Sequence, residues 1–379
     1  TTNLVEFYDG AAWRDLQSEE IPPIPSEHFN TVIYTGNGST QSITGVGFKP
    51  DFVWVKVTST TGSGPIADST RGTGKAMYSN LTDADYTFPA GQGVTSFDAD
   101  GFSVGDDSSG NGGYNGSGKT YVAWCWKANG GTTSSNTDGT QTSTVQVNTK
   151  AGFSIVQYTA SAAGASETVG HGLGTTPAVI ILKRTDATED WYVWHEDLGG
   201  GGSSALNEFL KLNDTSTEST ATNLFNTVNS TVFNPSYTNG VPNTNIAYCF
   251  AEKAGYSSFG SYTGNASDSG PIINTGFEPA WLMIKGRTSA VDGWFIVDNK
   301  RDTSNPRGIR LFANSNVGEA SESGAQVDFF TNGFQIRGTG AGQGQVNSSG
   351  ANYVYFAFAA TASSAPALPD SFANKLYNG

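Results

Sequence analysis

The sequence predicts an all-β protein made of three tandem β-sandwich domains behind a short N-terminal anchoring segment. Three observations lead to this fold class: a composition rich in turn-forming residues, a strand pattern that occurs three times, and very little helical periodicity. Many short strands, separated by turn signals at near-regular intervals, are typical of β-sandwiches.

The composition indicates a folded, turn-rich chain. Of the 379 residues, 48 are Gly and only 14% are charged, whereas about 25% of the residues in an ordinary soluble domain are charged. Ser, Thr and Asn fill the deficit. Aromatic residues reach 12%, which is too many for a disordered chain, because chains that cannot fold are poor in aromatic side chains.

The repeated pattern has three strands. Each copy opens with an aromatic strand that ends in Tyr-Thr, at residues 32–38, 155–159 and 259–265. A Gly-rich turn follows, and then a Pro begins an apolar strand that ends in Lys, always six residues later. These strands are 50–56, 177–183 and 279–285. Each copy closes with a third strand, at 122–126, 246–250 and 354–358.

The repeat sets the predicted domain boundaries, because each copy is roughly a hundred residues long, the size of one domain. The predicted parts are an attachment segment 1–28, domains 29–128, 151–254 and 255–360, a linker 129–150 and a C-terminal extension 361–379. Within the linker, residues 129–141 contain no apolar side chain, so we expect a flexible connection there. The much shorter junction near Gly255 predicts close packing of the second and third domains.

Local signals define the elements inside the copies. Copies one and three share an Asp/Asn-Gly-Phe element, at residues 100–102 and 332–334, and its Gly predicts a hairpin turn. The second copy has no clean version of it. Residues 204–212 are expected to form a short helix, because Leu206, Phe209 and Leu210 follow helical spacing.

Large apolar side chains on the predicted strands identify the core. Trp54 and Trp281 fall on the same face of the strands that follow their prolines, and Ile181 and Met283 occupy one equivalent position. Trp191 and Trp294 align in the second and third copies, so we expect them to fill equivalent core sites. Trp124 lies in the closing strand of the first copy and is expected to be central to that strand.

The N-terminal segment has its own signals. Residues 7–13 read as a small hairpin with an Asp9-Gly10 turn, and residues 21–25, with three prolines, read as an extended spacer. A two-stranded hairpin is barely stable alone, so we expect it to dock on a partner. Neither a basic start nor an apolar signal core occurs at the N-terminus, and no run approaches the 18 or so apolar residues that span a bilayer.

The two cysteines are expected to be reduced core residues. Cys125 and Cys249 occupy the same position in two closing strands, and Ala357 stands there in the third. A position that alternates between Cys and Ala holds a small apolar group. His28, His171 and His195 are scattered without ligand spacing, so no zinc or iron site is expected.

Carboxylates offer two further readings. Asp98 and Asp100, with Asp106 and Asp107 beyond them, faintly resemble a calcium loop, but they lack the distal bidentate Glu, and an Asp-Gly turn explains them equally. The acids in residues 189–197 are the closest grouping for glycoside hydrolysis, but they flank a strand instead of lining one face. No nucleophile elbow or phosphate-binding loop occurs. We therefore expect no enzymatic activity, no catalytic or metal residues and no cofactor.

The charge disfavours a nucleic-acid partner. The formal net charge is -14, and affinity for nucleic acid comes mainly from Lys and Arg. The densest basic group is Lys300, Arg301, Arg307 and Arg310, but Asp298 and Asp302 lie among them, which indicates a solvated loop.

The chain resembles a domain of unknown function that occurs in tail-fibre and other virion proteins of marine bacteriophages, loosely grouped with concanavalin- and laminin-G-like sandwiches. The segments that carry the resemblance are 34–56, which begins Tyr34-Thr35-Gly36-Asn37-Gly38, and 121–128, which contains Trp124-Cys125-Trp126. The match is good over 29–128, recognisable over 255–360 and weak over 152–254. The N-terminal residues 7–14 are also similar to segments near the starts of phage structural proteins. The resemblance implies jelly-roll or concanavalin-like domains and a virion location, and it assigns no catalytic residue.

Three functions remain open at this point. The first is a tail-fibre adhesin that attaches to other virion proteins through residues 1–28, forms a homotrimer by analogy with phage fibres, and binds host surface glycans. The second is a capsid decoration or connector protein on the capsid surface, and the third is a carbohydrate-binding module.

Overall fold

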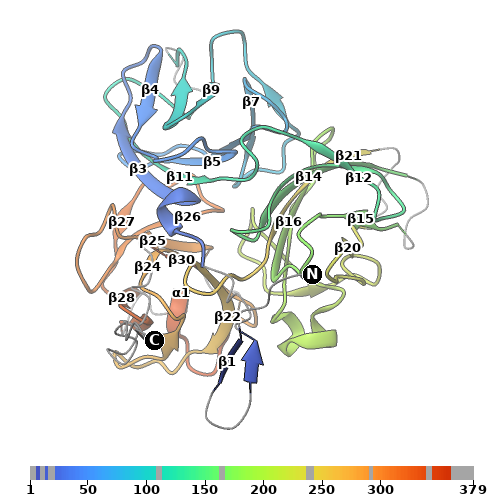
Figure 1. Ribbon diagram of the computed structural model, residues 1–379. Coiled ribbons are helices and arrows are strands. Elements are labelled where there is room, and N and C mark those ends of the chain that lie inside the picture. Colours follow the sequence, from blue (N-terminus) through green and yellow to red (C-terminus); the bar gives the residue numbers. More distant parts are fainter. Residues whose placement is uncertain are drawn as a thin grey trace, which may run out of the picture.

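The computed structural model describes residues 6–8, 13–15, 22–107, 113–161, 167–235, 243–289, 293–338 and 344–359. In these ranges the protein is all-β, as predicted, and its strands form separate antiparallel sheets. Three large sheets occupy three lobes (Figure 1). We call these lobes units 1, 2 and 3 in chain order, because each contains one copy of the repeated pattern.

Unit 1 is a sandwich of two sheets. The large sheet has the order β3 (Phe29–Thr35), β11 (Thr120–Trp126), β5 (Phe52–Val57), β6 (Pro65–Asp68), β7 (Lys75–Tyr78) and β8 (Tyr86–Thr87). The second layer has the order β4 (Gln41–Thr44), β10 (Gly101–Val104) and β9 (Val94–Asp98). Val53, Val55 and Phe102 belong to the buried cluster that joins the two layers.

Unit 3 repeats this arrangement. Its large sheet has the order β22 (Ser257–Thr263), β30 (Asn352–Ala359), β24 (Pro279–Gly286), β25 (Phe295–Asp298), β26 (Ile309–Phe312) and β27 (Ala320–Ser321). Its second layer has the order β23 (Ile272–Asn274), β29 (Gly333–Arg337) and β28 (Gln326–Phe330). The predicted hairpin glycines begin equivalent strands, β10 and β29. A Cβ on Gly101 would lie 2.0 Å from the carbonyl oxygen of Ile43, and one on Gly333 would lie 2.0 Å from that of Ile273, so only Gly fits at both positions.

Unit 2 departs from the pattern where its sequence diverges. Its large sheet has the order β12 (Ser134–Asn136), β13 (Ser143–Asn148), β14 (Phe153–Ala160), β21 (Asn243–Phe250), β16 (Val179–Arg184), β17 (Trp191–His195), β18 (Glu208–Lys211) and β19 (Ser219–Thr220). Among the described residues, its second layer is only the pair β15 (Val169–Gly170) and β20 (Val232–Phe233). The missing hairpin motif of the second copy therefore corresponds to a reduced layer.

Two predictions about unit 2 are wrong. The expected flexible linker over 129–141 contains β12, and the rest of the 129–150 segment contains β13, which pairs along β14 in the large sheet. Pairing with an available sheet edge fixes a backbone whose polar side chains alone predict disorder. The expected helix over 204–212 is a 3-10 turn, η4 (Gly202–Ala205), followed by β18, because the edge of β17 supplies hydrogen-bond partners that outweigh a weak helical pattern.

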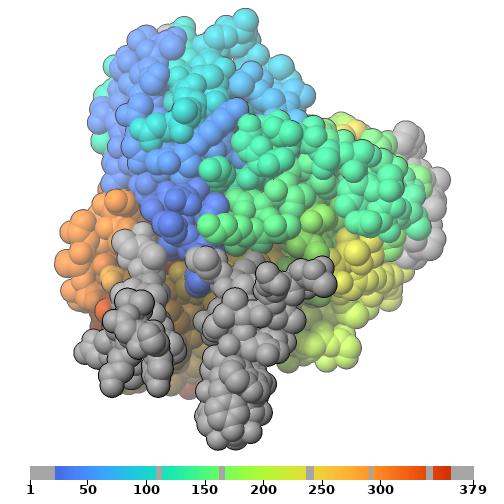
Figure 2. All heavy atoms as spheres, viewed as in Figure 1, coloured from blue at the N-terminus to red at the C-terminus, as the bar shows by residue number. Residues whose placement is uncertain are grey.

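The large sheets of all three units meet at a shared aromatic core. One buried cluster contains Trp124 and Trp126 of unit 1, Phe250 of unit 2, and Trp281 and Phe358 of unit 3. The predicted core positions Trp54, Ile181 and Met283 lie in the same cluster. Each large sheet is thus buried on both faces, once inside its own unit and once against the other two. Figure 2 shows the surfaces of units 1 and 2 meeting without a gap.

Three equivalent aromatic side chains lie at the centre of this core. They are Trp126, Phe250 and Phe358, which hold the same place in the three closing strands β11, β21 and β30. The ring centroids are 6.3 Å apart for Trp126 and Phe250, 5.4 Å for Trp126 and Phe358, and 5.9 Å for Phe250 and Phe358. The triangle they form marks a pseudo-threefold axis of the molecule.

The N-terminal segment contains an antiparallel pair, β1 (Glu6–Tyr8) and β2 (Trp13–Asp15), as predicted. The predicted Asp9-Gly10 turn and the C-terminal extension 361–379 lie outside the described residues. Residues 22–24 are irregular, and Pro25 begins the 3-10 turn η1 (Pro25–Glu27). The part of the chain that the structure describes also contains the helical elements η3 (Leu198–Gly200) and α1 (Gly344–Asn347). Among the described residues, no helix is both long enough and apolar enough to cross a membrane.

Candidate functional site

The lysines that end the three repeated apolar strands join the units into a closed ring. Lys183 of unit 2 donates to the carbonyl oxygen of Thr82 in unit 1 across 3.1 Å. Lys285 of unit 3 donates to that of Thr215 in unit 2 across 2.9 Å. Lys56 of unit 1 completes the circuit by donating to the carbonyl oxygen of Ser315 in unit 3. Each of these side chains therefore reaches from its own unit to the preceding unit of the ring. All three lysines are fully buried.

Two further sets of contacts follow the same circuit. The indole N–H of Trp191 donates to the carbonyl oxygen of Tyr78 in unit 1 across 3.0 Å, and that of Trp294 donates to the carbonyl oxygen of Lys211 in unit 2 across 2.8 Å. The predicted equivalence of the two tryptophans is confirmed. In unit 1, Gly64 occupies the position equivalent to these tryptophans and has no side chain to reach the next unit. The contact with unit 3 is made instead by Ser79, whose hydroxyl donates to the carbonyl oxygen of Ala313.

The closing strands supply the other set. Trp124 of β11 donates to Asp298 of unit 3, and Tyr248 of β21 donates to Asp68 of unit 1, at 3.3 and 2.8 Å. The third position holds Phe356, whose ring centroid lies 5.3 Å from that of His195 in unit 2. Chemically different pairs therefore fill one equivalent position at each of the three junctions.

Burial shifts the ionisation of these groups. Loss of hydration lowers the pKa of Lys183 to about 8, and loss of hydration together with the nearby charge of Arg301 lowers the pKa of Lys56 to about 8. The neutral form of His195 is favoured in the same way, with a pKa lowered to about 4. Perturbed pKa values cluster at functional sites in many proteins, but here they belong to groups that hold the units together.

The prediction of a solvated loop at 300–310 is correct for Lys300, which is exposed, and wrong for Arg301 and Arg307, whose side chains are buried. The Arg301 side chain is 2% exposed and forms an ion pair with Asp298 across 2.6 Å. Arg71 and Asp68 form the same pair, three residues apart, in unit 1. In both pairs the guanidinium is buried beside the carboxylate, because a buried charge without a partner of opposite charge is costly.

The remaining sequence candidates take structural positions. Cys125 and Cys249 are free and buried, which confirms their predicted core role. The three histidines lie apart: His28 contacts Asn148, His171 contacts the carbonyl oxygen of Asn229, and His195 lies in the junction of units 2 and 3.

The aspartates that resemble a calcium loop accept hydrogen bonds from neighbouring turns and strands. The carboxylate of Asp100 accepts the backbone N–H groups of Gly45 and Gly47, and that of Asp98 accepts the hydroxyl of Ser103. Within the described residues, no group of three or more His, Cys, Asp or Glu side chains could hold a metal ion.

The acids of residues 189–197 lie at the two ends of β17, as their flanking positions predict. At one end, Glu189 accepts the hydroxyl of Tyr192, and Asp190 forms an ion pair with Lys211 across 2.7 Å. At the other end, Glu196 and Asp197 line a cavity of about 350 Å³. The two pairs therefore cannot act together on one glycosidic bond.

The cavity at the end of β17 is lined by both polar and apolar residues. Its lining also includes Thr176, Ser203 and Leu206. Partial burial raises the pKa of the Glu196 carboxyl to about 7, and the charges of Asp197 and Glu252 act in the same direction. Carboxylates and hydroxyls in one concave site suit a ligand rich in hydroxyl groups.

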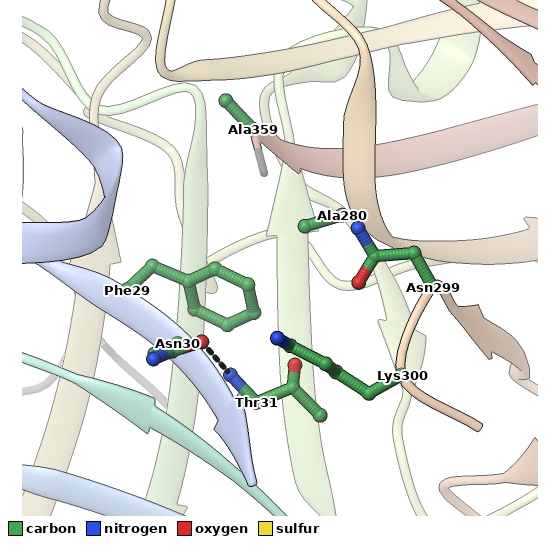
Figure 3. Close-up of a pocket in the computed structure, with 7 residues that line it drawn as sticks. All are labelled: Phe29, Asn30, Thr31, Ala280, Asn299, Lys300 and Ala359. Carbon is green, nitrogen blue, oxygen red and sulfur yellow. Dashed lines mark hydrogen bonds between the residues drawn. The ribbon is translucent and has the colours of Figure 1, made fainter. Parts of the chain in front are cut away.

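A second cavity, of about 130 Å³, lies between units 1 and 3 beside the start of β3 (Figure 3). Phe29, Thr31, Asn299 and Lys300 line it, and the hydroxyl of Thr31, the amide of Asn299 and the ammonium group of Lys300 point toward one space. Of these residues the sequence singles out only Lys300, as part of a basic group, and it does not predict the cavity, because the cavity forms only where two distant copies meet.

The comparisons with known proteins bear on the whole ring. No curated protein and no solved structure matches the chain. The family described as a domain of unknown function, DUF7483, matches residues 24–362, a span that runs through all three units. The chain therefore belongs to the DUF7483 family.

Proposed function

We propose that this protein is a non-enzymatic structural component of a bacteriophage virion, placed in a tail fibre, where it binds other virion proteins. The proposal begins from the resemblance of residues 34–56 and 121–128 to a domain of phage virion proteins. By analogy with phage fibres, which are commonly trimers, the proposal also includes a homotrimeric assembly.

The observation that carries the proposal is the use of the buried polar groups. Lys56, Lys183 and Lys285, together with the pairs Trp124–Asp298 and Tyr248–Asp68, all cross between units. These side chains, which in other proteins could take part in catalysis, here hold three units together around one aromatic core. A ring of units joined in this way suits a rigid structural protein.

The attachment role is assigned to residues 1–28. The strands β1 and β2 pair only with each other among the described strands, and a two-stranded hairpin is barely stable alone. The prolines at 22, 23 and 25 separate this hairpin from β3. A partner surface that receives the hairpin would stabilise it.

Binding of host glycans is assigned to the cavity at the end of β17. Glu196 and Asp197 offer acceptors for sugar hydroxyls, and Thr176 and Ser203 offer both donors and acceptors. A volume of about 350 Å³ is in the range of small-ligand sites. A glycan array probed with the purified protein and with Glu196→Gln tests this part, and only a signal that the substitution weakens supports it.

Localisation in the intact particle tests the main proposal. Purified virions imaged with a labelled antibody should carry the label on the tail, and deletion of residues 1–28 should remove the protein from the particle. Label on the shell would favour the alternative of a capsid decoration or connector protein. Normal incorporation of the truncated chain, or absence of the protein from particles, would refute the proposal.

A further inference from the structure

The outer edge of β3 has a covered counterpart in unit 2. In the sheet of unit 1, β3 is the outermost strand, and no described strand pairs with its outer edge. Its equivalent in unit 2 is β14, because both strands pair with the closing strand of their unit and both end in Tyr-Thr. In unit 2 that same edge is covered by β13 and β12.

Gln146 of β13 fills the junction between units 2 and 1. It lies opposite Ile155 of β14. Its side-chain nitrogen donates to the hydroxyls of Ser69 and Thr70 across 2.9 and 2.7 Å, and its side-chain oxygen accepts the backbone N–H of Gly131 across 2.9 Å. The carboxamide is fully buried and fully used there.

The same position at the junction of units 1 and 3 is the cavity of Figure 3. Thr31 is equivalent to Ile155, since the two lie opposite the equivalent residues Trp124 and Tyr248. Asn299 and Lys300 are equivalent to Ser69 and Thr70, because each pair directly follows the aspartate, Asp298 or Asp68, that pairs with an arginine three residues on.

Two buried polar atoms of residues that line this cavity have no partner among the described residues. Thr31 is only 3% exposed, yet its hydroxyl makes no hydrogen bond, and the buried amide oxygen of Asn299 makes none either. Buried polar atoms without partners are costly. The volume of about 130 Å³ corresponds to about four waters at roughly 30 Å³ each, which is enough for one carboxamide group.

The third junction is closed by the chain itself. Phe259 of β22 stands where Thr31 stands in unit 1, and its backbone N–H donates to the carboxylate of Glu252 across 3.1 Å. In unit 1 the N–H of Thr31 donates to the side chain of the adjacent Asn30. Of the three equivalent places, the one beside β3 therefore combines a strand edge that no described strand pairs with, and two buried polar atoms that make no hydrogen bond.

We propose that β3 accepts an antiparallel strand from a partner protein, and that a Gln or Asn of this strand, opposite Thr31, inserts its carboxamide into the cavity. The amide nitrogen donates to Thr31 and Asn299, and the amide oxygen accepts from Lys300. Exposed sheet edges are established docking sites for extended segments. The inference rests on the proposed function only in taking the partner to be another protein of the same assembly.

Register-specific disulfide trapping tests the proposal. Ile33 is 49% exposed and is equivalent to Gln157, which pairs with Thr144 of β13. The probe is a synthetic peptide of residues 142–149 with Cys in place of Thr144, added to the full chain carrying Ile33→Cys. Directly opposite residues in an antiparallel pair lie within disulfide reach. The native Cys125 and Cys249 are buried and should not compete.

We expect the trapped yield to fall about tenfold when Ala replaces Gln in the peptide, the factor that two ordinary hydrogen bonds contribute. A peptide whose Cys is moved by one residue should be trapped as poorly as the peptide in which Ala replaces Gln. The matched control is Ser261→Cys at the equivalent exposed position of β22, which should trap the peptide no better than the shifted register does. Thr31→Val, checked for an unchanged melting temperature, should reproduce the loss seen with Ala.

Equal trapping of all peptides, or equal trapping on β3 and β22, would overturn the proposal. The assay uses purified protein and a peptide, so its result does not depend on where the protein resides. Absence from virions would refute the proposed function and leave the strand pairing intact, whereas failed trapping would do the reverse.

Discussion

The indole nitrogen of Trp124 lies 3.3 Å from the Oδ2 atom of Asp298, although 174 residues separate the two in the chain. The same carboxylate accepts the guanidinium of Arg301 across 2.6 Å. Both Trp124 and Asp298 are fully buried. One carboxylate thus links the closing strand of the first repeat to a turn of the third, and the ring of units closes at this point.

Replacing Trp124 with Ala should lower the free energy of unfolding by on the order of 3 to 5 kcal/mol, because a cavity opens in the shared core. Trp124→Phe keeps most of the ring and removes the donor to Asp298, so it should cost less, about 1 to 3 kcal/mol. Urea unfolding of both variants measures the difference. A loss below about 1 kcal/mol for the Ala variant would contradict a central role for this strand.

Gln146→Ala should lower the free energy of unfolding by about 1 to 3 kcal/mol, because Gly131, Ser69 and Thr70 lose a buried hydrogen-bond partner. The control is Thr144→Ala on the same strand, where the side chain is exposed. Thermal unfolding of the two variants makes the comparison. Equal stability of the two would show that the carboxamide is not needed at the junction of units 1 and 2.

Lys183 should make a contribution to the stability of the protein that becomes more favourable as the pH increases from 8 to about 10. Burial lowers the pKa of Lys183 to about 8, against an ordinary value of 10.5 in the unfolded chain. Between these values Lys183 binds more protons in the unfolded chain, so its contribution to stability increases with pH there. Below pH 8 the full cost of burying the charged lysine is present in the folded state.

The difference in stability between the unsubstituted protein and Lys183→Met should therefore change with pH over this range in favour of the unsubstituted protein, because Met retains most of the apolar stem and does not titrate, whereas Lys56 and the other titrating groups are common to both. Lys150→Met, at an exposed position, serves as the control and should leave the profile unchanged. The free energy of unfolding is measured by urea titration at several pH values from 7 to 10. Parallel pH profiles for the unsubstituted protein and Lys183→Met would show that Lys183 does not titrate in this range.

Neither cysteine should react with a thiol reagent in the native protein. Burial raises the pKa of both thiols, so little thiolate is available, and both side chains are fully buried. Two thiols should become reactive in denaturant. Reaction of either thiol at native conditions, at the rate of a free peptide, would contradict the predicted core positions of Cys125 and Cys249.

The local chemistry of the sequence is sufficient for part of this structure. The period-two patterns predict the strands β5, β16 and β24 behind Pro50, Pro177 and Pro279, and all three strands are found there. The alternation of Cys with Ala predicts the core position of Cys125, and the Asp/Asn-Gly-Phe elements predict two hairpins. These features depend on near neighbours in the chain, and therefore leave a pattern that can be read without the fold.

Other features depend on which edge or face meets which, and no local pattern contains that information. Residues 129–141 are polar throughout, and only the free edge of β14 makes part of them a strand. The regular Pro-to-Lys spacing marks Lys56, Lys183 and Lys285 but does not reveal that each crosses to the preceding unit. The sequence alone determined the strands, the repeat and the small and large positions of the core. The tertiary structure decided that the three repeats share one core and close into a ring, because the partners of each buried lysine, indole and carboxylate come from a different repeat.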